Sequence, residues 1–178
     1  STQGSTLFPY TTLFRSRLDQ PDDPAAREFI AQAVEDAAPD ELPGVTPDEL
    51  AANLADFWAF ASRRKGRGPM MRLVPMLGEG AAGLDRLEIV QDDAPFLVDS
   101  VMGEVTGQGF PVQAMFHPLL AVSRNRAGER VVEGPSRRES MIQVILEHVG
   151  ADRERALLEG VAEALADVRA AVADFPAM

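Results

Sequence analysis

The sequence predicts an α+β fold in which an antiparallel sheet carries two helices on one face, preceded by a helical segment. Three observations support this fold class. A strand-like apolar run at residues 87–90 leads directly into a helical pattern, the apolar spacing changes to two after residue 112, and a long amphipathic helix follows the last strand-like run. The resulting order, βαββα, is that of a ferredoxin-like domain without its last strand.

The first helix of this unit is predicted from the segment that follows residues 87–90. Asp92, Asp93 and Pro95 form a helix-start signal, because a carboxylate can cap free backbone N–H groups and proline loses nothing in the first turn. Apolar residues then recur at helical spacing until two glycines end the pattern; they are Phe96, Leu97, Val101, Met102 and Val105.

The strands after this helix are predicted from a spacing of two. One face of the second strand combines Val112, Ala114, Phe116, Leu120 and Val122. The polar segment 124–130 predicts a hairpin turn, and residues 131–132 begin the return strand. Residues 140–149 form a strand covered on both faces. A helix from Asp152 carries Leu157, Val161, Leu165, Val168 and Val172 on one side. The residues expected to be mostly buried between the sheet and the two helices are Leu97, Val101, Phe116, Leu120, Val144, Leu146, Leu158, Val161, Leu165 and Val168. Since a fourth strand is due after the last helix, we expect the domain to be truncated at its C-terminus.

Two helices are predicted in residues 17–68, ahead of the α+β domain at residues 69–178. The sequences at residues 22–24 and 46–49 are helix starts, and the second is a capping box. Their apolar faces are expected to pack on the following domain. Trp58 lies in the second helix, where packing is preferred over stacking on a ligand.

The first sixteen residues differ in style from the rest of the chain. The stretch LFPYTTLFRS, residues 7–16, resembles translated sequencing-adapter read-through and contains the only tyrosine, Tyr10. The alternative is a natural β-prone extension. We expect residues 1–16 to be disordered or loosely attached, and they are left out of the fold prediction.

Composition restricts the class of protein. A net charge of −11 argues against nucleic-acid and anionic-membrane partners, which require stripes of Lys and Arg. The absence of cysteine excludes disulfides, thiolate metal sites and a cysteine nucleophile, and it is consistent with a reducing cytoplasm. No apolar run approaches the ~20 residues of a membrane span. These features predict a cytoplasmic protein.

Several motifs that carry chemistry elsewhere fail here on their context. The stretch 77–83, LGEGAAG, matches a dinucleotide-binding pattern, but too few residues separate it from the next strand to begin a helix. Asp99, Ser100 and His117 lack a nucleophile-elbow pattern, and His148 has no partner at metal-ligand spacing. We therefore predict no catalytic, cofactor-binding or metal-binding residue in this chain.

A resemblance to a known family is carried by blocks in a fixed order. The segments are MRLVPM at residues 71–76, DDAPFLVDS at 92–100, FHPLLAVSRNRAG at 116–128, ES at 139–140 and DVRAAVADFPAM at 167–178. Over roughly residues 50–178, the chain resembles the N-terminal ACT-like region of the large bacterial NAD-dependent glutamate dehydrogenases.

The resemblance implies a regulatory or structural fragment of an oxidoreductase. The enzyme would deaminate L-glutamate to 2-oxoglutarate and ammonium with NAD, in a catalytic core that this chain lacks. Its partners would be the remaining domains of the same polypeptide, other subunits, and an amino-acid effector. The alternative is a free-standing ACT-type amino-acid-sensing module.

The same resemblance implies where a functional surface lies. ACT domains bind amino acids at a strand-to-helix loop, which maps here onto Asp92, Asp93, Pro95 and Phe96. A glycine usually follows the proline; the phenyl ring of Phe96 would fill that space, and the two carboxylates oppose an anionic ligand. We therefore predict that this effector or interface loop serves packing between domains or subunits rather than amino-acid capture.

Overall fold

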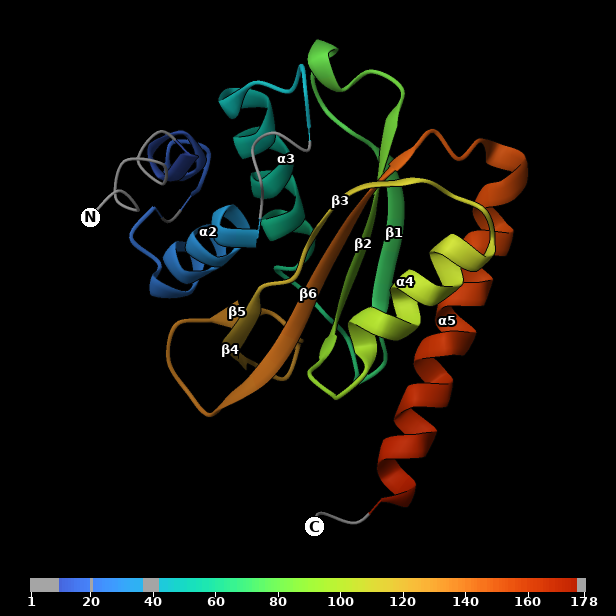
Figure 1. Ribbon diagram of the computed structural model, residues 1–178. Coiled ribbons are helices and arrows are strands. Elements are labelled where there is room, and N and C mark those ends of the chain that lie inside the picture. The colour runs from blue at the N-terminus through green and yellow to red at the C-terminus, as the bar shows by residue number, and fades with distance from the viewer. Residues whose placement is uncertain (1–9, 20, 37–41, 176–178) are drawn as a thin grey trace.

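The computed structural model describes residues 10–19, 21–36 and 42–175, and it consists of three layers (Figure 1). A central sheet has helices α4 and α5 on one face and helices α2 and α3 on the other. The helices are α2 (Pro24–Asp36), α3 (Pro47–Phe60), the 3-10 helix η2 (Glu79–Ala81), α4 (Leu97–Gly107) and α5 (Ala151–Asp174). This arrangement confirms the predicted α+β, ACT-like architecture with two helices on one face.

The sheet is antiparallel throughout and its order is β1-β2-β6-β4-β5, with β3 also paired to β6. The strands are β1 (Met70–Pro75), β2 (Leu84–Asp92), β3 (Val112–Phe116), β4 (Leu119–Arg124), β5 (Arg130–Val131) and β6 (Ser136–Glu147). The place beside β2 that the fourth strand takes in a ferredoxin-like sheet is occupied by β1. Strand β1, which precedes the βαββα unit in the chain, therefore covers the edge for which the sequence predicted a strand after α5.

The predicted second strand is divided into β3 and β4 at His117 and Pro118. Proline has no backbone N–H to give to a ladder, so the strand bends there and both halves pair with β6. A register shift between Val112 and Ala114 also turns Val112 toward the α4–α5 side, whereas Ala114 lies on the α2–α3 side. The predicted common face of residues 112–122 is therefore wrong at its first residue.

Two apolar layers form the core, one on each side of the sheet. The layer under α4 and α5 contains most of the residues whose apolar spacing predicted burial there, namely Leu97, Val101, Val144, Leu146, Val161, Leu165 and Val168. Phe116 and Leu120 are buried as well, but in the opposite layer. Leu158 of α5 was predicted to be buried but is only half-buried. Leu157, which is in phase with Val161, is fully buried instead.

The helical segment before the sheet shares this core. Residues of α2 and α3 pack against β3, β4 and β6, as their apolar faces predicted. The capping box of α3 is present: Thr46 Oγ1 accepts from the Glu49 N–H at 3.1 Å, and Glu49 Oε2 accepts from the Thr46 N–H at 3.0 Å. In the described part of the chain, no helix has the length and apolar character to cross a membrane.

The N-terminal stretch differs from the expectation of disorder where the structure describes it. Residues 10–15 are helical, and Phe14 is fully buried with its ring centroid 5.7 Å from that of Phe29. The apolar side chains of this stretch can be buried against α2, which offsets the entropy of ordering it. Residues 1–9 lie outside the described residues, so the expectation for them stays a prediction.

Candidate functional site

The carboxylates of Asp92, the last residue of β2, and of Asp93, in the loop before α4, each form an ion pair with an arginine. Asp92 Oδ1 accepts from Arg64 Nη1 at 2.8 Å. The Asp93 N–H donates to the Arg138 carbonyl at 2.9 Å, and its Oδ2 lies 3.6 Å from Arg138 Nε. Neither side chain caps α4, because the residue at the cap position is Phe96 and no side chain accepts there. The predicted capping by Asp92 and Asp93 is therefore wrong.

Phe96 has an unusual backbone and a solvent-facing ring. Its φ of 67° and ψ of 9° lie in the left-handed region, and among the described residues it is the only non-glycine with a positive φ. Such a conformation costs a non-glycine residue on the order of 1–3 kcal/mol. The sequence predicted that the phenyl ring would fill the space beside the loop. The residue is instead 71% exposed, so the ring points into solvent.

An apolar groove lies between this loop and α5. It has a volume of about 660 Å³ and is lined by Pro95, Phe96, Ser100, Ala164, Asp167, Val168, Ala171, Val172 and Phe175. The α5 members recur at steps of three and four and so form one stripe along the helix. Phe175 is 75% exposed. Two exposed aromatic rings beside an apolar stripe are typical of a surface that another protein segment covers.

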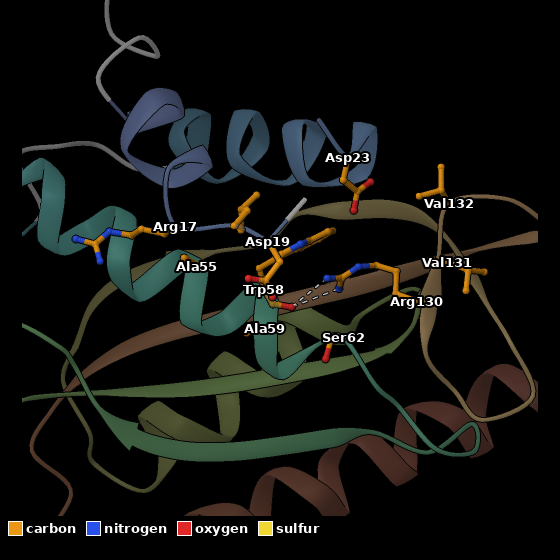
Figure 2. A pocket seen from close by; sticks show the side chains of 11 residues that line it. Arg17, Asp19, Asp23, Ala55, Trp58, Ala59, Ser62, Arg130, Val131 and Val132 are labelled. Carbon is orange, nitrogen blue, oxygen red and sulfur yellow. Dashed lines mark hydrogen bonds between the residues drawn. The ribbon is translucent and has the colours of Figure 1, made fainter. Parts of the chain in front are cut away.

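Trp58 is a packing residue rather than an open stacking platform. The Arg130 side chain reaches Trp58 (Figure 2). Its guanidinium lies over the indole ring, with 3.5 Å between the Arg130 Cζ and the ring centroid. The same guanidinium donates to the Trp58 carbonyl at 3.3 and 3.4 Å. Burial lowers the pKa of Arg130 to about 10. Since Trp58 also contacts Phe29 at 5.1 Å between centroids and is 5% exposed, the predicted packing role is confirmed.

Ser100 and His117, which lacked a nucleophile-elbow pattern in the sequence, have different surroundings in the structure. Ser100 lines the apolar groove, whereas His117 forms a hydrogen bond with the Ser140 hydroxyl. Burial lowers the pKa of His117. His148 Nδ1 lies 3.1 Å from Asp85 Oδ2, and no group of three or more potential metal-ligating side chains occurs within the described residues.

The glycine-rich stretch 77–83 forms a short tethered turn. It contains the three-residue helix η2, and β2 begins at Leu84, so a dinucleotide helix does not start there. Gly80 donates its N–H to Glu49 Oε1 at 3.0 Å. A Cβ on Gly80 would lie 1.9 Å from the Gly44 carbonyl oxygen, so close backbone approach explains this glycine. Absence of NAD binding by this chain stays a prediction.

Comparison with known proteins places this chain in a family. Residues 29–161 match the family model described as "Glutamate dehydrogenase, ACT1 domain". The chain belongs to this family. The match begins within α2, includes α3, the whole sheet and the loop before α4, and ends within α5, so the glutamate dehydrogenase ACT1 domain extends across both predicted segments. The family named from sequence resemblance is thereby confirmed.

Two curated relatives of this ACT1 domain are NAD-specific glutamate dehydrogenases. The protein from Halomonas elongata is 29% identical over 176 residues, which cover 92% of this chain and 11% of the relative. The protein from Pseudomonas aeruginosa is 33% identical over 100 residues, which cover 52% of this chain and 6% of the relative. The matches thus span about a tenth or less of these relatives. No solved structure gives a significant match.

Sequence reasoning missed two features of the ACT1 domain. Phe175 was not recognised as part of a surface, although its spacing from Val172 and Ala171 continues the α5 stripe. The basic run at residues 63–67 follows the second predicted helix, and nothing in its sequence predicted a site there. In the structure this run meets two other segments and lines a pocket, which only the fold could show.

Proposed function

We propose that this chain is the N-terminal structural and regulatory module of a large cytoplasmic NAD-specific glutamate dehydrogenase. Oxidative deamination of L-glutamate to 2-oxoglutarate and ammonium, with NAD, takes place in a catalytic core outside this chain. The family match and the names of the two relatives support the assignment to that enzyme. The role of the module is to dock through the apolar groove onto another domain of the same polypeptide.

The observation that carries the docking role is the pair of exposed rings at the groove. Phe96 is exposed and has a strained backbone, and Phe175 is exposed directly after the end of α5. Burying a phenylalanine side chain is worth roughly 1.5–3 kcal/mol. A covering domain would recover that free energy at both rings, which would offset the backbone strain at Phe96.

The groove predicts opposite effects of one substitution in two forms of the protein. Phe96→Gly should raise the melting temperature of the 178-residue chain, because glycine adopts a positive φ without strain. In the complete dehydrogenase polypeptide it should instead lower the stability of this module, because an interface ring is lost. Val132→Ser, at another exposed apolar residue (65% exposed), is the control. Equal gains in both forms would contradict docking at the groove.

A second candidate function is amino-acid sensing at the same loop. The free N-terminus of α4 favours it, because no side chain caps the helix and its N–H groups suit a carboxylate. The two loop carboxylates, being bound to Arg64 and Arg138, do not fill that position. The lining of the groove is mostly apolar, however, and its one charged residue is Asp167. Docking of another domain therefore fits this surface better than binding of a zwitterionic amino acid does.

Thermal-shift measurements separate the two functions. With glutamate, aspartate, arginine and other amino acids, we expect no saturable rise in the melting temperature of the 178-residue chain. A ligand at a hundred times its dissociation constant would stabilise the domain by about 2.7 kcal/mol, which is a shift of several degrees. A saturable shift with one amino acid, abolished by Ser100→Ala or Asp167→Ala in the groove, would establish sensing instead.

A further inference from the structure

Positive charge is concentrated in one pocket of this acidic chain. The pocket has a volume of about 620 Å³, and seven of the 17 Lys and Arg side chains line it against two carboxylates. We call it the arginine pocket; its charged lining is Arg63, Arg64, Lys65, Arg67, Arg124, Arg126, Arg137, Asp92 and Glu139. An excess of five positive charges therefore lies in one cavity of a chain whose net charge is −11.

The floor of the arginine pocket is an internally neutral network. Arg64, which is 3% exposed, donates from Nη1 to Asp92 at 2.8 Å and to Glu139 at 3.1 Å. Arg124 donates to both oxygens of Glu139, at 2.8 and 2.9 Å. The two carboxylates thus balance the two arginines of the floor. Neither carboxylate remains to neutralise the other cations of the pocket.

The same two arginines fix the loops that carry the rim. Arg64 Nη2 donates to the Arg67 carbonyl at 2.7 Å, and Arg124 Nη1 donates to the Gly128 carbonyl at 2.8 Å. The Arg64 N–H also donates to the Gly128 carbonyl at 2.9 Å, and a Cβ on Gly128 would lie 2.1 Å from the Arg64 oxygen. The two loops are therefore locked together, and the pocket is built before any ligand arrives.

The five remaining cations surround the opening without an anionic partner. Within the described residues, no ion pair is formed by Arg63, Lys65, Arg67, Arg126 or Arg137. Like charges held this close repel one another, so an anion between them is stabilised by several cations at once. Guanidinium groups in particular donate two parallel hydrogen bonds to phosphate or carboxylate oxygens.

We propose that the arginine pocket binds a phosphorylated small molecule. A phosphate group carries a charge of about −1.5 to −2 and three acceptor oxygens, which matches a donor-only rim with several unbalanced cations. A free amino acid brings one carboxylate together with an ammonium group that the rim repels. Arg67 from the segment after α3, Arg126 from the turn between β4 and β5, and Arg137 from the start of β6 would hold the phosphate.

Calorimetric titration of the 178-residue chain with inorganic phosphate, pyrophosphate and glutamate tests this site. We expect saturable binding in the order pyrophosphate, phosphate, glutamate, weakening as salt is added. Arg126→Gln and Arg137→Gln should each weaken pyrophosphate binding at least tenfold, since each removes a charge-assisted contact. Both side chains are exposed, so their removal should leave the melting temperature nearly unchanged.

Arg27→Gln, at an exposed arginine of α2 outside the pocket, is the matched control and should bind pyrophosphate as the parent chain does. Equal weakening by the control and the pocket variants would overturn the proposal, because it would show nonspecific attraction. Non-saturable heats with every anion would overturn it as well. A glutamate-rich peptide that binds more tightly than pyrophosphate would make the pocket a docking site for an acidic protein segment instead.

Discussion

Replacing Leu165 with aspartate should unfold the domain. Leu165 is fully buried in the layer between α4, α5 and the sheet. An unpaired carboxylate in that layer costs several kcal/mol, which is comparable to the whole stability of ~5–15 kcal/mol of a domain. Val101→Asp should act in the same way from α4, where that side chain is also fully buried. Urea unfolding followed by circular dichroism measures the effect.

The neighbouring position on α5 gives the matched control. Ala166 is exposed, so Ala166→Asp should cost only the helix-propensity difference, about 0.7 kcal/mol or less. The two substitutions add the same charge to the same helix one residue apart. If Leu165→Asp unfolded at the same urea concentration as Ala166→Asp, the face of α5 assigned to the core would be wrong.

Helix faces could be predicted from the sequence because an apolar stripe repeats every three or four residues whatever packs on it. Strand faces were less secure. Phe116 and Leu120 were expected under α4 and α5 but face α2 and α3. The sheet is covered on both sides, so an apolar side chain is buried whichever way it points, and alternation alone does not identify the layer.

The loop before α4 shows why the candidate site was harder. Asp92 and Asp93 have the local pattern of helix caps, but their partners lie far away in sequence. Arg64 precedes Asp92 by 28 residues, and it reaches the end of β2 only through the fold. A charged partner brought in by tertiary structure competes with the local backbone, and here it holds the carboxylate. The sequence pattern therefore predicted a helix cap, whereas in the structure Asp92 forms an ion pair with Arg64.

A second buried charge network connects the sheet to α3 and β1. Glu88 is fully buried and accepts from Arg86 at 2.7 Å, from Arg72 at 2.6 Å and from Gln143 at 2.8 Å. Arg86 and Arg72 also donate to Asp56 of α3, at 2.8 and 2.7 Å. In β2, Arg86 and Glu88 alternate with apolar residues of the α4–α5 layer, so this polar face follows the strand period.

Replacing Arg86 with methionine should therefore be strongly destabilising at neutral pH. Removing one partner of a buried ion pair costs about 3–5 kcal/mol, because the other charge is left without compensation. Arg72 remains beside both Glu88 and Asp56, but its single positive charge balances only one of these two carboxylates. Chemical denaturation at about pH 7 measures the loss, with Arg155→Met, at an exposed arginine of α5, as the control.

The pH dependence of that loss identifies its cause. Burial raises the pKa of Glu88 above its ordinary value of 4.5, even though Arg86 and Arg72 lower it. Without Arg86 the pKa of the folded state should rise further. A carboxyl group with a raised folded pKa stabilises the protein at low pH, and this stabilisation is lost as pH rises through that pKa. The deficit of Arg86→Met should therefore be largest near neutral pH and shrink toward about pH 5.

Adding Glu88→Gln should recover stability at neutral pH, because a neutral amide needs no counter-charge yet still accepts from Arg72. A deficit that is the same at both pH values, and that Glu88→Gln leaves in place, would assign the loss to the packing of the Arg86 side chain instead of its charge.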